Sequence, residues 1–354
     1  MRAIGVLEPG GAQLSALRLS RALRDHGIET TIVAGDATPA GLEVARAHGF
    51  EVEQFSEVRN LQWEPCQAFA DWLAERLAAA DLVHGHMFGA WWAAARAAPD
   101  HVPVVASEHN ALCWPRAAHD EDAATVAGRL GCFFGHGPET RAWAARIGVP
   151  GDRIIAGESA IESLDARPQS DIPAPRITFA GRLAAERGPD VLVEAIGMLA
   201  DPPPTFLLGD GELRAALEHQ VASLHLEDVV RFSGWQARPE RTIAGAAVHV
   251  VPSRRDAWSQ SAVLAMGLGV PVVASNVEGL PETLADGRGI LVPADEPRAL
   301  ASAIGEVLAG RGSSDLDAAR AYARRFTPER VARRYASVYR ALATADSEAL
   351  RRAA

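Results

Sequence analysis

The chain has 354 residues, of which 48% are hydrophobic and 23% charged, which is typical of two α/β domains with sizeable cores. Its formal net charge of −10 argues against nucleic acid and against strong binding to an anionic membrane surface. All 35 basic residues are arginine, which excludes chemistry that needs a Schiff-base or P-loop lysine. No apolar run approaches the roughly 20 residues of a membrane span, and the first apolar stretch is too short for a secretory signal. Three cysteines without metal-ligand spacing fit a reduced, cytoplasmic protein.

The first half alternates short apolar strands with helical patterns. We expect a strand over residues 3–8, a turn at Gly10–Gly11 and a helix with Ala16, Leu19 and Leu23 on its apolar face, ended by Gly27. Further strands are expected within residues 30–35, 81–86, 102–110 and 153–161. This alternation predicts a parallel sheet with helices on both faces.

The second half repeats the pattern after a proline-containing linker, residues 163–175. Six strands are expected, within residues 176–182, 205–212, 229–235, 248–253, 270–275 and 289–294. Thr327 and Pro328 carry the signature of a helix start. We therefore expect an N-terminal domain over residues 1–165, a C-terminal domain over 166–330 and a C-terminal helix over 331–354.

The segment PSRRDAWSQSAVLAMGLGVPVVASNVEGLPE, residues 252–282, carries the strongest functional pattern. A turn leads into a helix, whose N-terminus concentrates unpaired N–H donors and suits a pyrophosphate. A buried strand and a second glycine-containing turn follow. An ordinary strand–turn–helix–strand unit of any α/β protein would read the same way.

With GRLAAERG at residues 181–188, this segment resembles the donor-sugar site of the retaining family 4 glycosyltransferases. The resemblance covers most of the chain and is strongest from Ile177 to Pro293. It implies the α/β GT-B fold: two Rossmann-like parallel-sheet domains facing across a cleft, with the C-terminal helix crossing back to the N-terminal domain. It implies nucleotide binding in the C-terminal domain, the acceptor on the N-terminal side, and a leaving phosphate held by Arg182 and Arg187. The latter replaces the family's lysine and keeps the charge.

One family motif is altered. Where relatives carry two glutamates eight positions apart, this chain has Asp256 and Leu264. The resemblance gives Asp256 a contact to the donor sugar, but Leu264 cannot hold the ribose hydroxyls. Glu278 and Glu282 are nearby candidates for that role.

The resemblance also implies the remaining site residues. Those assigned to the donor are Gly10, Gly11, Gly181, Gly209, Trp235, Ser259, Gln260, Ser261 and Glu278. Those assigned to the acceptor side are Gln13, His86, Glu108 and Asn110. His109 is matched with the histidine that contacts the donor sugar and stabilises charge, whereas His84 is interpreted as a core residue.

The resemblance predicts a glycosyltransferase that moves a sugar, with retention, from a nucleotide-sugar (a UDP-sugar). The acidic N-terminal domain favours a small soluble acceptor, and the altered motif fits a divergent member that acts in the biosynthesis of an antibiotic or other specialised metabolite. No cofactor and no metal are expected, and the protein is expected to be a monomer or homodimer. Two alternatives stay open: a nucleotide-sugar epimerase of the same architecture, and a catalytically silent nucleotide-sugar-binding protein.

Overall fold

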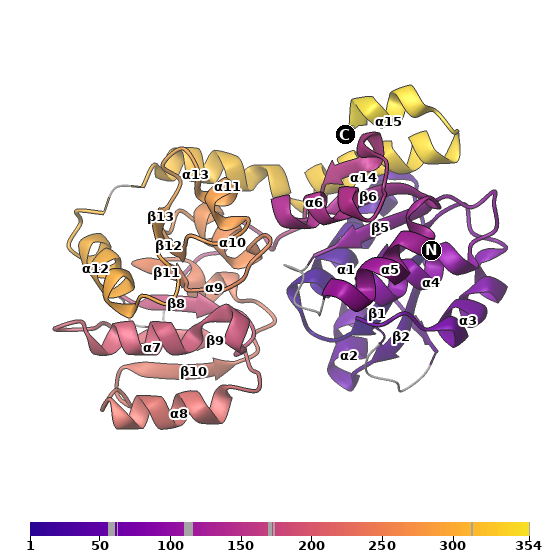
Figure 1. The fold of residues 1–354 in the computed structure, drawn as a ribbon. Coiled ribbons are helices and arrows are strands. Elements are labelled where there is room, and N and C mark those ends of the chain that lie inside the picture. Colours follow the sequence, from indigo (N-terminus) through magenta and orange to yellow (C-terminus); the bar gives the residue numbers. More distant parts are fainter. Residues whose placement is uncertain are drawn as a thin grey trace. The chain divides into compact units, whose positions relative to one another are not determined.

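The computed structural model describes residues 1–353 except 56–60, 62, 110–115, 169–171, 173 and 313, and leaves out the side chains of 116–118, 347 and 353. The chain forms two compact units (Figure 1). Unit 1 comprises Met1–Ala160 and Pro328–Ala354, and unit 2 comprises Ile161–Thr327. The first crossing between units thus falls five residues before the expected boundary, and the second, between Thr327 and Pro328, falls three residues before the second expected boundary.

Unit 1 contains a seven-stranded parallel sheet in the order β3-β2-β1-β4-β5-β6-β7. Its strands are β1 (Arg2–Leu7), β2 (Ile32–Ala37), β3 (Val52–Gln54), β4 (Val83–His86), β5 (Val104–Glu108), β6 (Leu130–Gly135) and β7 (Ile154–Ala156). Its helices are α1 (Gly11–Leu23), α2 (Pro39–Ala47), α3 (Gln67–Leu77), α4 (Phe88–Ala97), α5 (Arg116–Ala127), α6 (Pro138–Arg146), α14 (Pro328–Ala343) and α15 (Ser347–Ala353), with short 3-10 turns at Arg24–His26 and Gly151–Arg153. The expected strands are confirmed, and β3 and β6 are additions.

Alternation along the strands of unit 1 separates two faces of the sheet. On one face Val104 of β5 and Phe133 of β6 pack in a cluster with Trp91 of α4. On the other, Ile4 of β1 packs with Leu17 of α1. The same alternation leaves Arg2, His84 and His86 on the second face, where they are buried polar groups that need partners.

The C-terminal helix α14 supplies part of that second face. It packs against α1, and the Tyr335 hydroxyl donates to the Glu158 backbone oxygen at 3.1 Å. Arg334 forms an ion pair with the Glu158 carboxylate at 2.7 Å. The helix begins at Pro328, as expected from the proline preference of the first helical position.

Unit 2 contains a six-stranded parallel sheet in the order β10-β9-β8-β11-β12-β13. Its strands are β8 (Ile177–Ala180), β9 (Thr205–Leu208), β10 (Val230–Gly234), β11 (Val248–Val251), β12 (Val272–Ser275) and β13 (Ile290–Val292), which confirms all six expected strands. Its helices are α7 (Pro189–Gly197), α8 (Arg214–Ser223), α9 (Glu240–Ile243), α10 (Gln260–Gly267), α11 (Leu280–Leu284), α12 (Pro297–Leu308) and α13 (Leu316–Ala323), with 3-10 turns η3 (Ala185–Arg187) and η4 (Arg324–Phe326).

The helices of unit 2 cover both faces of its sheet. One apolar core joins Val248 and Val250 of β11 to Leu192 of α7 and Ile304 of α12, and α7 also contacts α8. Helix α10 packs against β11, β12 and α13 instead. Both units therefore have the Rossmann-like arrangement that the sequence predicts. In the described part of the chain, no helix is both long and apolar enough to span a membrane.

Candidate functional site

The strand order of unit 2 reverses between β8 and β11, which lie side by side in the sheet. From β8 the chain moves toward β9, and from β11 it moves toward β12, so the two following loops diverge. Ligands of open parallel sheets bind beyond the carboxyl ends of the strands at such a switch point. Those loops carry Gly181, Arg182 and Arg187 on one side and Asp256 on the other, so the topology brings the two sequence motifs together.

Two glycines allow the loops of unit 2 to pack backbone against backbone. Gly188 has φ +62°, and a Cβ there would collide with the carbonyl oxygen of Pro252. Gly209 has φ +148°, and a Cβ there would collide with the carbonyl oxygen of Gly181. Both positions therefore require glycine for conformation and for space.

Arg187 and Asp256 form an ion pair across the switch point. Arg187 Nη1 lies 2.5 Å from Asp256 Oδ2, and Ser253 Oγ donates to the same oxygen at 3.4 Å. The Asp256 side chain is 2% exposed and that of Arg187 35%. Arg187, expected to bind phosphate, and Asp256, expected to contact the sugar, thus contact each other. Arg182, which follows β8 in the same segment as Arg187, is exposed.

Arg254 holds this loop pair in place, although the sequence reasoning gave it no role. It makes two hydrogen bonds to the Asp190 carboxylate, at 2.9 and 2.6 Å, and one to the Ala185 oxygen at 2.7 Å. The backbone N–H groups of Arg254 and Arg255 both donate to the Glu186 oxygen. Burial alone would raise the pKa of Asp190, but the Arg254 guanidinium and backbone hydrogen bonds together lower it below its usual value. Two consecutive arginines in the loop after β11 are the sequence feature that marks this role.

Glu278 lies on the second glycine turn, next to the first. Its Oε1 accepts from Arg255 at 3.1 Å, and the neighbouring Gly279 N–H donates to the backbone carbonyl oxygen of Asp256 at 3.1 Å. Its Oε2 is buried without a hydrogen-bond partner among the described residues. Burial raises the pKa of Glu278 although Arg255 acts in the opposite direction. The backbone is left-handed there, with φ +45°.

The start of α10 is capped by a side chain. Ser259 Oγ accepts from the Ala262 N–H at 3.3 Å and also lies 3.3 Å from Ser261 Oγ. Ser259 is 4% exposed, so its hydroxyl serves the helix terminus, whereas Gln260 and Ser261 are partly exposed. Leu264 is 2% exposed within α10, so this position offers an apolar core group and no ribose acceptor.

The remaining aromatic candidate of unit 2 is Trp235, directly after β10. It is 40% exposed, one of few large exposed apolar side chains in the described part of the chain. Its position after the strand end and its exposure allow the stacking role expected for it. Glu282 on α11 is exposed as well.

In unit 1 the glycine turn follows β1, which lies beside β4 at that sheet's own switch point. Gly10 is the N-cap of α1 and Gly11 its first residue, which is exposed. Gln13 is 6% exposed, and its side-chain amide donates to the Val6 oxygen at 3.1 Å. Gln13 therefore braces the turn.

Four histidines, two on β4 and one each directly after β5 and β6, form a chain of ring contacts. His84 and His86 stack with centroids 4.2 Å apart, His86 and His109 with centroids 5.3 Å apart, and His109 and His136 with centroids 3.9 Å apart. His86 Nδ1 lies 3.1 Å from His109 Nε2, and Arg2 Nη1 lies 2.6 Å from His86 Nε2. Both ring nitrogens of His86, which the sequence placed on the acceptor side, are therefore engaged within the protein. His84 lies in the core, as expected.

Burial keeps these imidazoles neutral. It lowers the pKa of His109 to about 3, with Arg2 adding to the effect, and it lowers the pKa of His84, His86 and His136 well below the usual value. Arg2 and the neighbouring histidines add to the effect of burial at His84 and His86, and His109, Arg141 and Arg334 add to it at His136. A neutral imidazole carries a single N–H, so each ring has one donor and one acceptor nitrogen.

Glu108 is fully buried beside this chain of rings. Its carboxylate accepts from the Trp91 indole at 3.4 Å and from the His109 N–H at 3.0 Å, so it orients the backbone that carries His109. Asn110, the other acceptor-side candidate, lies outside the described residues.

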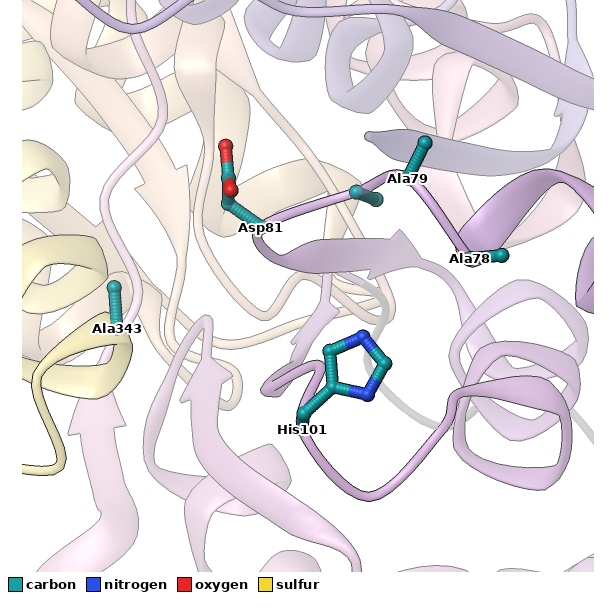
Figure 2. Close-up of a pocket in the computed structure, with 6 residues that line it drawn as sticks. Ala78, Ala79, Asp81, His101 and Ala343 are labelled. Atoms are coloured by element: carbon teal, nitrogen blue, oxygen red, sulfur yellow. The ribbon is translucent and has the colours of Figure 1, made fainter.

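A hollow of about 300 Å³ lies elsewhere in unit 1 (Figure 2). It is lined by Ala78–Asp81, His101 and Ala343. These residues precede β4 and β5 or end α14, so the hollow lies at the amino ends of the strands. It is thus at the edge of the sheet opposite the histidines and the glycine turn. Within the described ranges, no group of three histidine, cysteine, aspartate or glutamate side chains is placed to hold a metal ion.

Two family models match the chain. The model described as Glycosyltransferase Family 4 matches residues 9–156, and the one described as Glycosyl transferases group 1 matches residues 174–310. Together they take in most of both units. The chain therefore belongs to the glycosyltransferase families that these two models describe.

Individual relatives are similar over part of their length. The chain is 33% identical over 187 residues to a D-inositol 3-phosphate glycosyltransferase of Streptomyces griseus, and 36% identical over 174 residues to one of Mycolicibacterium gilvum. The matches cover 48% and 47% of this chain but 35% and 37% of those proteins. The aligned part thus spans about a third of their length.

Solved structures match over nearly the whole chain. Anabaena HepE in complex with UDP-glucose has a TM-score of 0.78 at 19% identity, covering 94% of this chain and 97% of that one. Sucrose-phosphate synthase from Thermosynechococcus elongatus has a TM-score of 0.79 at 19% identity, covering 98% and 100%. This likeness shows the fold, which is GT-B.

Proposed function

We propose that the protein transfers a sugar, with retention and without a metal, from a UDP-sugar to a small soluble acceptor. The observation that carries the proposal is the meeting of Arg187 and Asp256 at the switch point of unit 2, where open parallel sheets bind their ligands. A nucleoside diphosphate would place its phosphates near Arg182 and Arg187. Similarity to a fold solved with UDP-glucose supports uridine as the base.

In the proposed reaction the bond between the sugar C1 and the diphosphate oxygen breaks first. The sugar gains oxocarbenium character, and Arg182 and Arg187 stabilise the negative charge that develops on the phosphate. The acceptor hydroxyl attacks C1 from the same face, and its proton passes to the departing phosphate. No strong protein base is needed, which agrees with the lowered pKa of His109.

The acceptor is proposed from charge. Residues 1–165 carry 22 acidic residues against 13 arginines, so a polyanionic or phospholipid acceptor would be repelled. A small soluble acceptor, with amines among its groups, suits such a domain. Formation of a specialised metabolite such as an antibiotic is one setting for such a reaction.

Calorimetric titration with UDP, GDP, ADP, TDP and UDP-sugars tests the donor site. We expect one nucleotide to bind, and Arg182→Ala to weaken its binding at least tenfold because charged hydrogen bonds are lost. Arg241→Ala, which removes an exposed arginine on α9, is the matched control and should bind normally. Binding that does not depend on Arg182, or no binding at all, would count against the proposal.

Turnover is tested with sugar conjugates of the nucleotide that binds and with a panel of acceptors. Release of the nucleoside diphosphate is followed with and without EDTA. Retention is tested from the anomeric proton coupling of the product. A changed sugar released without acceptor would indicate an epimerase. Binding without any turnover would indicate a silent binding protein, which the apolar Leu264 in place of a ribose acceptor favours as the second candidate.

A further inference from the structure

Arg2 fixes which nitrogen of His86 carries the proton. The guanidinium on β1 is 2% exposed, and its Nη1 lies 2.6 Å from His86 Nε2. A guanidinium donates and cannot accept, so His86 Nε2 must be the acceptor. His86 is buried and neutral, and its one proton is therefore on Nδ1.

His86 passes this constraint to His109. Its Nδ1–H points to His109 Nε2 at 3.1 Å, so that nitrogen must accept. The proton of His109 is then on Nδ1. His136 stacks on the His109 ring with centroids 3.9 Å apart, and Glu108 Oε1 accepts from the His109 backbone N–H. The ring plane and the backbone are thus held as well as the tautomer.

A second branch from Arg2 holds the arginine itself in place. Arg2 Nη2 donates to the Tyr339 hydroxyl at 3.2 Å, and that hydroxyl lies 2.6 Å from His84 Nδ1. Arg2 Nη1 also lies 3.4 Å from His84 Nδ1, and because a guanidinium can only donate, that nitrogen is an acceptor. The Tyr339 hydroxyl therefore donates to His84 Nδ1, and His84 Nε2–H donates to Ser107 Oγ at 2.8 Å. Residue 339 comes from α14, so the C-terminal helix takes part in orienting the N-terminal histidines.

We propose that Arg2 and His86 are positioning residues that hold His109 as its Nδ1–H tautomer, so that it offers substrate a hydrogen-bond donor and not a base. The inference rests on the proposed function, in which His109 contacts the donor sugar. It identifies the donating atom and two residues that determine it. Neither residue needs to touch the substrate.

Long-range proton–nitrogen correlation spectra of the full chain, labelled with ¹⁵N-histidine, test the tautomer without substrate. His109→Gln assigns the His109 signals. We expect a protonated Nδ1 and an unprotonated Nε2 for His109, and the same pattern for His86. A wild-type spectrum with His109 protonated on Nε2 would overturn the proposal, whatever the enzyme's activity.

Paired variants test whether Arg2 and His86 are the cause. Arg2→Met removes the donor and should allow His109 to populate both tautomers, whereas Arg2→Lys keeps a donor and should preserve the wild-type spectrum. His86→Leu and His86→Gln form a second pair, because a glutamine can accept from Arg2 and donate to His109. An unchanged His109 spectrum in folded Arg2→Met or His86→Leu protein would also overturn the proposal.

Activity adds a separate readout. In Arg2→Met and His86→Leu, His109 should lose one neutral hydrogen bond to the substrate. Their kcat/KM should therefore fall roughly three- to tenfold, whereas that of Arg2→Lys and His86→Gln should stay nearer to wild type. UDP affinity should stay unchanged in all four. If the His109 tautomer shifts but kcat/KM does not, His109 has no role at the sugar, and that part of the proposed function is wrong. Control of the His109 tautomer by Arg2 and His86 would still hold.

Discussion

The Arg187 guanidinium lies 2.5 Å from the Asp256 carboxylate, and this carboxylate is 2% exposed. The contact joins the turn after β8 to the loop after β11, so each residue orients the other before substrate arrives. In the proposed donor site, a bound phosphate would share the Arg187 guanidinium with Asp256. The strength of phosphate binding and the rate of transfer should therefore respond differently to changes at Asp256.

Replacing Asp256 by asparagine should separate the effect on phosphate binding from the effect on the transfer rate. The variant keeps shape but removes the competing charge, so UDP should bind at least as tightly as to wild type. Turnover should fall roughly 100-fold, because the loop loses its ion pair and the sugar a charged acceptor. Calorimetry measures UDP affinity, and initial rates of UDP release measure turnover. Loss of UDP binding in Asp256→Asn would mean that the pair supports the ground-state complex instead.

Gly209→Ala should damage the donor loop. A Cβ there collides with the Gly181 carbonyl oxygen, and φ is +148°, so the loop after β8 must shift. We expect a loss of about 2 kcal/mol or more in unfolding free energy and weaker UDP binding. Gly197→Ala on α7, where the nearest atom would be 3.6 Å away, is the control and should be neutral or slightly stabilising. Urea unfolding of both variants, compared by midpoint and slope, provides the measurement.

Glu278 can be tested as the ribose acceptor with a thermodynamic cycle. Wild type and Glu278→Gln are each titrated with UDP and with its 2′-deoxy analogue. If Glu278 accepts from the 2′-hydroxyl, the substitution should weaken UDP roughly tenfold and barely change the deoxy compound. Because burial raises the pKa of Glu278, the glutamine should cost little stability. Equal effects on both nucleotides would remove Glu278 from the ribose site.

The buried histidines should make unit 1 sensitive to acid. Their folded-state pKa is lowered, to about 3 for His109, whereas an unfolded histidine has a pKa of about 6.5. Their contribution is fully present above about pH 6.5 and is lost as pH falls toward 3, because the unfolded chain takes up protons. Each histidine should lower the unfolding free energy by about 1.4 kcal/mol per pH unit in that window.

Urea midpoints measured from pH 7.5 to 4.5 check this dependence. His136→Phe should reduce the slope of stability against pH, since one buried titrating ring is removed. Phe133→Leu is the control, because it weakens the same core without changing the number of bound protons. An equal slope in wild type and His136→Phe would show that another group dominates the acid response.

Much of the architecture could be predicted because local pattern decides it. Apolar runs ending in glycine, serine or charged residues indicated parallel strands, and all six in the second half are present. Gly27 was predicted to end the first helical segment, and it caps that segment with φ +70°. β6 was not predicted; its LGCFFG sequence interrupts the apolar run with glycines and lacks the flanking pattern of its neighbours. Its partners in the sheet decide its conformation.

The sequence by itself determined which residues could carry charge and hydrogen bonds: arginine in place of lysine at 187, aspartate at 256 and leucine at 264. Their partners depend on contacts between residues far apart in the chain, which no local spacing encodes. Only the tertiary structure joined Arg187 to Asp256, put Arg255 against Glu278 and brought Tyr339 to Arg2 and His84. Burial likewise follows from packing, and it is burial that keeps the histidines neutral and makes the tautomer of His109 a property of the fold.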